Sequence, residues 1–230
     1  MIFDQIMNGS SASFADTVAV IVFMAVISIL SITLREYVRA RLTVKLGGEA
    51  TASINPLKQI NISNVISIII LAFFSVSWTK PKRTELSAGK NALIALSAPL
   101  TNIVTALACM LIYDILYVIN VNIYVATEVY PTVLMWISMF FSSGVLVNLG
   151  YALFSLLPIP GTDGGLIIAQ ILPEKIREKF LYFDKFSYIV LFFLVLIASR
   201  SGIAASIINE IAMTAEYLFL SLMNLIFPVN

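Results

Sequence analysis

Hydrophobic residues fill six long runs of this chain, separated by short polar or charged stretches. The first run covers residues 17–34, and its helical pattern continues to Lys45, where Gly47-Gly48 breaks it. The later runs cover residues 62–78, 89–119, 131–158, 186–199 and 203–227. Because a membrane-spanning helix needs roughly 20 apolar residues, this pattern predicts an all-α polytopic membrane protein with five to six apolar segments.

Composition supports this class. The chain is 60% hydrophobic and 12% charged, with a mean hydropathy of +0.96, which is not typical of a soluble domain. We expect one membrane-embedded domain over 1–230, with a core at about 17–185 and C-terminal helices at 186–227. The single Cys109 excludes an internal disulfide and a cysteine-rich metal site. No basic stripe interleaved with aromatic residues points to nucleic acid. The lipid bilayer is the expected partner, and no feature indicates the oligomeric state.

Loop charge predicts the orientation, because Lys and Arg collect on the cytoplasmic side. The basic residues at 80–90 place that loop inside, and the loop at 120–130, which lacks Lys and Arg, goes outside. A charged interfacial helix at 173–185 returns the chain inside. Both flanks of 62–78 are basic, so we predict that this segment enters the membrane and leaves on the same side. The segment at 203–227 either spans the membrane or lies in its interface.

Arg35, Glu36 and Arg39 follow the first apolar run, and the i, i+4 spacing puts both arginines on one helix face. Taken alone, this segment favours a basic helix end whose arginines reach the cytoplasmic interface. A site needs a second element, for which Asp163 is the candidate. It follows a Pro-x-Pro break and precedes Gly164, where interrupted membrane helices often position polar groups. Its alternative role is that of a loop aspartate that caps the next helix.

Three further polar residues lie inside apolar runs. Asn148 and Ser155 are spaced i, i+7 before the Pro-x-Pro break, and hydrogen bonding between helices is their favoured role. Binding of a substrate or partner is the functional alternative for both residues. Asn102 follows Pro99 by three residues, and we predict that it bonds to a carbonyl freed near that proline.

Together these segments resemble the site-2 protease family of intramembrane zinc metalloproteases, in its short bacterial form. Leu34 to Ala40 is similar to the His-Glu-x-x-His helix of that family, and Asn55 to Gln59 to its Asn-Pro-Leu-Lys-His turn. Trp78 to Pro81 resembles a Trp-Ala-Lys-Pro segment, and Ala98 to Asn102 resembles Gly-Pro-Leu-x-Asn. Asn148 and the run from Phe154 to Gly165 resemble the Asn-Leu-Leu-Pro-Ile-Pro-Pro-Leu-Asp-Gly element, which supplies the third zinc ligand.

The chain departs from this family at the catalytic positions. Arg35 and Arg39 stand where the resemblance puts ligand histidines, and Asp163 stands at the third ligand position. Glu36 occupies the general-base position. The chain contains no histidine, and arginine cannot coordinate a cation, whereas a catalytic zinc needs three protein ligands and a water. We therefore expect no zinc cofactor and no peptide hydrolysis.

The charges of the replacing residues suggest another role. The family site carries +2 from its metal, and Arg35 and Arg39 also carry +2. We hypothesise that both guanidinium groups pair with Asp163, with Glu36 as a further candidate partner, and replace the ion electrostatically. A buried ion pair of this kind favours one specific packing arrangement but adds little net stability.

Three functions remain open from the sequence. The first is a non-catalytic family member, a pseudoprotease in the bacterial cytoplasmic membrane that binds a transmembrane segment or a partner protein. The second is a metalloendopeptidase with atypical metal ligands. The third is a structural or transporter-like membrane protein, in which water would reach Arg39 and Asp163.

Overall fold

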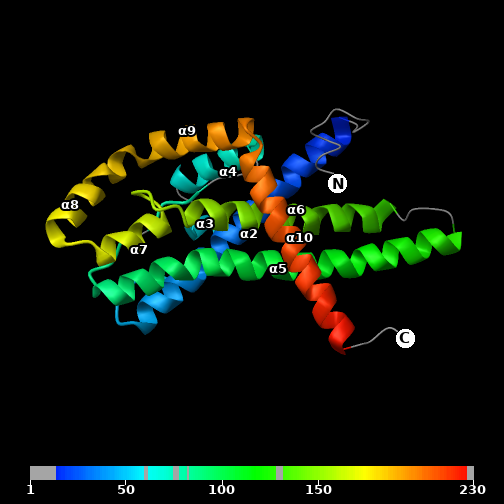
Figure 1. Ribbon diagram of the computed structural model, residues 1–230, viewed down its shortest axis with the longest axis horizontal. Coiled ribbons are helices and arrows are strands. Elements are labelled where there is room, and N and C mark those ends of the chain that lie inside the picture. The colour runs from blue at the N-terminus through cyan, green and yellow to red at the C-terminus, as the bar shows by residue number, and fades with distance from the viewer. Residues whose placement is uncertain (1–13, 60–61, 75–77, 82, 128–131, 227–230) are drawn as a thin grey trace.

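The computed structural model describes residues 14–59, 62–74, 78–81, 83–127 and 132–226. Within these ranges the chain is helical and has no strand, which confirms the predicted all-α class (Figure 1). In chain order the elements are α2 (Phe14–Lys45), α3 (Pro56–Gln59), α4 (Ile62–Phe74), α5 (Ala88–Thr127), α6 (Thr132–Ser155), α7 (Asp163–Ile171), α8 (Glu174–Tyr182), the 3₁₀ helix η1 (Phe183–Phe186), α9 (Ser187–Arg200) and α10 (Ile203–Ile226).

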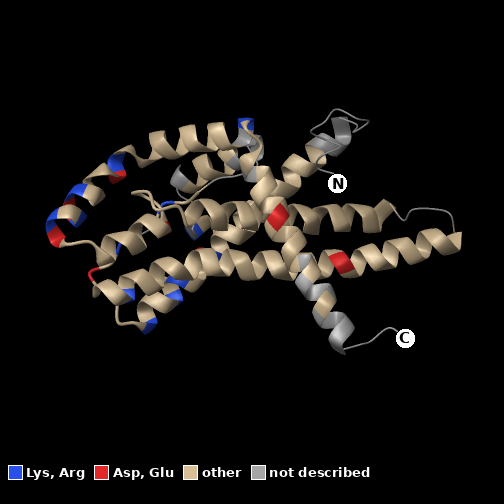
Figure 2. Ribbon diagram, viewed as in Figure 1, with Lys and Arg blue, Asp and Glu red and all other residues tan. Residues whose placement is uncertain are grey.

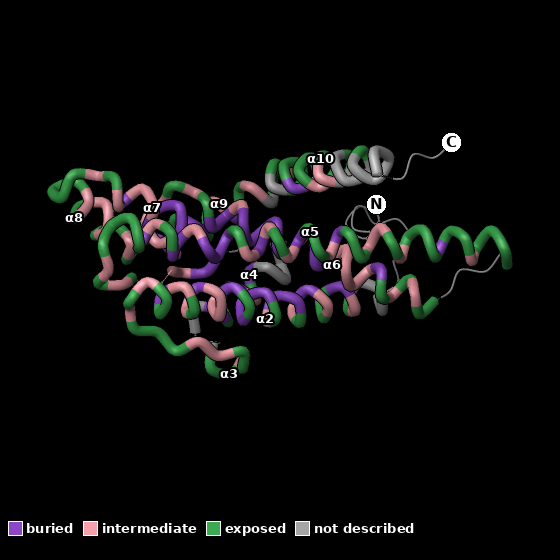
Figure 3. The backbone as a smooth tube through the Cα atoms, turned by 90° about the horizontal axis from the view of Figure 1, so that it is seen from below, coloured by how far each residue is buried: buried purple, intermediate pink, exposed green. Residues whose placement is uncertain are grey.

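The long helices α2, α5 and α6 form the centre of the molecule: α5 and α6 run side by side, and α2 crosses them obliquely (Figures 1 and 3). α5 and α6 approach closely where Gly144 meets Cys109, because a Cβ at Gly144 would lie 2.7 Å from the cysteine sulfur. Two groups of buried apolar side chains hold the bundle together. One joins α2 to α6 through Met24, Ile32 and Val147, and the other joins α4, α5, α6, α9 and α10.

Among the described residues, four stretches are long and apolar enough to cross a membrane: Val18–Lys45, Ala88–Thr127, Thr132–Ser155 and Glu174–Ala198. Large apolar side chains such as Leu30, Val104 and Ile189 are exposed along them. Such a surface suits contact with lipid rather than water. The protein is therefore an integral, polytopic membrane protein.

Lys and Arg residues gather at one end of the bundle, where α5 begins and α8 lies (Figure 2). α5 ends and α6 begins at the opposite end (Figure 1). The two basic segments thus share one end, as loop charge predicted, whereas the last turns of α5 and the start of α6 lie at the other end. By the positive-inside rule, we predict that the basic end faces the cytoplasm.

α4 is the short helix within the predicted re-entrant segment. Its 13 residues give a length of about 20 Å at 1.5 Å per residue, which is less than the roughly 30 Å of hydrocarbon. The Ser67 hydroxyl of α4 donates to the Tyr151 hydroxyl of α6 (3.3 Å), which ties α4 to the bundle. This length agrees with a segment that does not cross alone. Re-entry itself stays a prediction, because residues 75–77 lie outside the described ranges.

One predicted boundary is wrong. Residues 120–127 were expected in a loop but form the last turns of α5. They contain no Gly or Pro, and the Asn120 amide donates to Ser138 Oγ of α6 (2.9 Å), so nothing in them ends the helix. The run at 131–158 ends its helix at Ser155, because Pro158 lacks an N–H and disfavours helical backbone before it.

Candidate functional site

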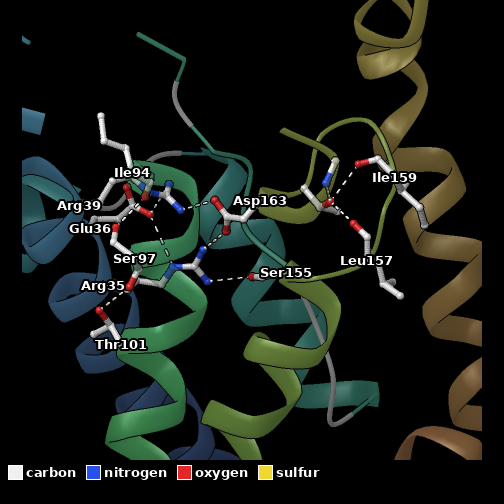
Figure 4. Close-up of polar contacts among 12 residues, drawn as sticks. Arg35, Glu36, Arg39, Ile94, Ser97, Thr101, Ser155, Leu157, Ile159 and Asp163 are labelled. Carbon is white, nitrogen blue, oxygen red and sulfur yellow. Dashed lines mark hydrogen bonds and ion pairs between the residues drawn. The ribbon is translucent and has the colours of Figure 1, made fainter. Parts of the chain in front are cut away.

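The second half of α2 positions the three charged residues of the first motif. α2 continues without a break from the membrane segment to Lys45, and Gly47 ends it with a φ of +91°. Because the helix is regular through this region, Arg35 and Arg39 lie one turn apart on a single face. Both side chains point from that face toward the turn that begins α7 (Figure 4).

The Pro-x-Pro break positions Asp163 as the first residue of α7. Thr162 is the N-cap, and its hydroxyl accepts a hydrogen bond from the Gly165 N–H (2.9 Å). The same hydroxyl contacts the Ile159 carbonyl oxygen at 2.9 Å, which closes the turn on itself (Figure 4). The suggestion that Asp163 caps this helix is therefore wrong. With the cap supplied by Thr162, the Asp163 carboxylate is free to face α2.

The Asp163 carboxylate binds both arginines (Figure 4). Arg35 Nη2 donates to Oδ2 at 2.9 Å, and Arg39 Nη2 donates to Oδ1 at 2.6 Å. Arg39 Nη1 also donates to Glu36 Oε1 at 3.0 Å. The predicted pairing with Asp163, and with Glu36 as a further partner, is confirmed. We call Arg35, Glu36, Arg39 and Asp163 the arginine–aspartate cluster.

Burial distinguishes this cluster from a solvated helix end. Arg35 and Asp163 are 0% exposed and Arg39 is 3% exposed, so the interpretation as arginines reaching the interface is wrong. Two guanidinium groups and two carboxylates sum to a formal charge of zero. A buried charge is tolerated only when it is paired and hydrogen-bonded, and each Asp163 oxygen accepts one charge-assisted bond.

Ser155 joins the cluster, because its hydroxyl accepts a hydrogen bond from Arg35 Nη1 at 3.3 Å. This contact links α6 to α2 and confirms the predicted interhelical role. Asn148 behaves differently: its amide nitrogen donates to the Gly144 carbonyl of its own helix (2.8 Å). Its amide oxygen is buried and has no hydrogen-bond partner within the described part of the chain. The favoured interhelical role of Asn148 is therefore wrong for this structure.

Asn102 is also buried, and neither atom of its amide has a hydrogen-bond partner among the described residues. The predicted bond to a carbonyl near Pro99 is thus wrong. The hydroxyl of Thr101, next in sequence, bonds instead to the Ser97 carbonyl (2.7 Å). Asn102 faces the interior of the bundle.

Sequence reasoning missed two residues beside the cluster. Tyr151 is fully buried on α6 and contacts Ser67, and Thr162 forms the cap that orients Asp163. A signal existed for Tyr151, since Asn148, Tyr151 and Ser155 fall on one helix face at i, i+3 and i+7. The side chain of Gln59, at a family histidine position, lies outside the described part.

The residues of this site do not fit a zinc ion. Arg35 and Arg39 have no lone pair to offer, and both oxygens of Asp163 already bind guanidinium groups. Among the described residues, no group of three or more His, Cys, Asp or Glu could hold a metal ion. The site is built to pair charges within the protein.

Close backbone packing at the start of α7 gives the first testable prediction. A Cβ at Gly165 would overlap the Ile159 carbonyl oxygen, and a backbone atom cannot move aside as a side chain can. Gly165→Ala is expected to lower the free energy of unfolding by about 3 kcal/mol or more, measured by denaturation in mixed micelles. Gly89→Ala is the matched control, because no atom lies within 4 Å of a Cβ there. Equal stability of both variants would contradict the described turn.

A curated relative is similar to most of the chain. It is named "Putative zinc metalloprotease YwhC", from Bacillus subtilis strain 168, and it is 24% identical over 193 residues. The aligned region covers 78% of this chain and 82% of the relative. This similarity fits a site-2 protease-like family. No family model matches the sequence, and no solved structure is significantly similar to it.

Proposed function

We propose that this chain is a non-catalytic membrane homologue of the site-2 proteases, a pseudoprotease that holds a transmembrane segment of a partner protein in the bacterial cytoplasmic membrane. The observation that carries the proposal is the engagement of both Asp163 oxygens by Arg35 and Arg39. The positions that supply metal ligands in the resembled family here form ion pairs with one another. Glu36, at the general-base position, is likewise bound to Arg39.

Charge balance explains how such a site persists without an ion. The buried Asp163 carboxylate and the partly buried Glu36 carboxylate would be costly without a cation, or would take up protons. The two guanidinium groups supply the +2 that a divalent ion supplies in the family. In this chain the Pro-x-Pro turn attaches to α2 through nitrogen–oxygen contacts of 2.6 and 2.9 Å, which serve the packing role that we propose for the ion of the resembled family.

An apolar groove supports the binding part of the proposal. It has a volume of about 180 Å³ and lies between α5, α6 and α10. Its lining residues include Ala106, Met110, Leu149, Ala152, Ala212 and Ala215. A groove of this size takes one or two apolar side chains of a neighbouring helix rather than a whole helix. In hydrocarbon, small residues such as these alanines permit close helix approach.

A metalloendopeptidase with atypical ligands is the second candidate, and the printed name of the B. subtilis relative favours it. A transporter-like role receives less support, because it needs water at Arg39 and Asp163, which are 3% and 0% exposed.

Liposomes that hold the purified chain, zinc and a labelled single-pass peptide of about 20 leucines test the proposal. Energy transfer measures association and gel electrophoresis measures cleavage. We expect association without cleavage, and a several-fold weaker association for Ala212→Phe, which fills the groove. Ala205→Phe is the control, since Ala205 is exposed on the same helix. Cleavage that disappears in Glu36→Gln would establish the second candidate, and association unaffected by Ala212→Phe would contradict the groove.

A further inference from the structure

The helix α8 lacks the packing that normally holds a helix of its length. It has nine residues, and none of them is buried. α8 continues through η1 into α9, so its side chains, rather than its helical form, are left for contact with surroundings outside the protein. Ile176 and Phe183 are 53% and 57% exposed, which gives those surroundings an apolar side to meet.

Basic and aromatic residues form a continuous strip along this segment. Lys175, Lys179 and Tyr182 are spaced i, i+4 and i+7, so they share one face of α8. Lys185 Nζ lies 3.6 Å from the centroid of the Tyr182 ring and 5.0 Å from that of Phe186. We call Lys175, Lys179, Tyr182 and Lys185 the α8 strip. All four residues are exposed.

Within the described part of the chain, no acidic residue, including the adjacent Glu178, forms an ion pair with the α8 strip. Asp184 accepts ion pairs from Lys80 Nζ (3.1 Å) and Arg83 Nη2 (3.0 Å), which fasten η1 to the loop before α5. Glu174 lies 3.8 Å from Arg177. The ion pairs within the described part of the chain include none of the three lysines of the strip. Their charges are therefore available to an external anion.

We propose that the α8 strip binds the phosphate headgroups of anionic lipids in the cytoplasmic leaflet. α8 opens the candidate span Glu174–Ala198 and lies at the basic end of the molecule (Figure 2), which places it at the membrane boundary. The lysines meet phosphate there, while Ile176 and Phe183 enter the edge of the hydrocarbon. Basic residues beside exposed aromatic and aliphatic residues are the pattern of helices that lie in the interface, and each Lys adds attraction to an anionic surface.

Spin-labelled phosphatidylglycerol and phosphatidylcholine, compared in liposomes that hold the full chain, test this inference. Electron paramagnetic resonance gives the ratio of protein-associated lipid for the two headgroups. Lys175→Gln/Lys179→Gln is expected to lower the preference for phosphatidylglycerol about fivefold or more at low salt, since each Lys near an anionic surface contributes about 1 kcal/mol. High salt is expected to weaken the preference of the unaltered chain.

Two controls separate the α8 strip from general charge effects. Lys175→Arg/Lys179→Arg keeps both charges and is expected to retain the preference. Arg200→Gln removes an exposed charge at the far end of α9 and is expected to leave it unchanged. A preference that survives Lys175→Gln/Lys179→Gln, or that falls equally in Arg200→Gln, would overturn the inference.

Discussion

Replacement of Asp163 with asparagine is expected to lower the free energy of unfolding by about 3–5 kcal/mol, because it leaves two buried guanidinium groups that share one remaining carboxylate partner in the described part of the chain, Glu36. Arg35 would keep the weaker contact with Ser155 at 3.3 Å and the ion pair of its Nε with Glu36 Oε1 at 3.6 Å, and Arg39 would keep Glu36. No water reaches these groups at exposures of 0% and 3%, so solvation cannot compensate. Unfolding by SDS in mixed micelles measures the change.

Asp184→Asn is the matched control for that experiment. Asp184 also accepts two cationic partners, Lys80 and Arg83, but the partner side chains are 34% and 46% exposed. Ion pairs of this kind contribute about 0–1 kcal/mol. Comparison of the loss of unfolding free energy in Asp163→Asn with that in Asp184→Asn therefore measures how much burial increases the cost of removing a carboxylate. Equal losses in Asp163→Asn and Asp184→Asn would contradict a buried, charge-balanced cluster.

The double substitution Arg35→His/Arg39→His is expected to create zinc binding. The two imidazoles would share one face of α2 at i, i+4 and would face Asp163, which the present arginines already contact. Two histidines and one carboxylate form a three-ligand set of the catalytic type, with a fourth position for water. We expect about one tightly bound zinc ion per chain in this variant, measured by elemental analysis after dialysis against a weak chelator.

Two further variants make that result specific. Arg35→Gln/Arg39→Gln removes both positive charges and supplies no imidazole, so it is expected to bind no zinc at the site. Arg35→His/Arg39→His/Asp163→Asn removes the third ligand and is expected to lose most of the affinity. Zinc content in Arg35→His/Arg39→His no higher than in Arg35→Gln/Arg39→Gln would show that α2 and the α7 turn do not converge as described.

The pairing of the two arginines with Asp163 was predictable, because it depends on residue types and spacings that can be read directly from the sequence. Arg35 and Arg39 share a face through the helical period alone, and the resemblance of the run around Asp163 supplied the opposite partner. Charge matching then required the pairing. The sequence did not predict how deeply Arg35 and Arg39 are buried, since the local pattern of α2 equally fits arginines that reach the membrane interface.

Other features depend on where side chains meet in three dimensions. Thr162 rather than Asp163 caps α7, and both are common N-cap residues, so sequence alone could not choose. Asn148 bonds back to the Gly144 carbonyl of its own helix, a bond within one turn that competes with the interhelical bond expected of a buried Asn. α5 extends beyond the apolar run that ends at 119, because the polar residues Asn120 and Asn122 end the run without ending the helix: Asn120 bonds to Ser138 of α6 and Asn122 to the Val118 carbonyl.

The zinc content of the unaltered chain, purified in the presence of added zinc and dialysed before elemental analysis, tests most directly whether arginines occupy the place of the ion. We predict zinc well below one ion per chain, and the same value for Glu36→Gln/Asp163→Asn. About one zinc ion per chain, lost in Glu36→Gln/Asp163→Asn, would contradict the non-catalytic assignment.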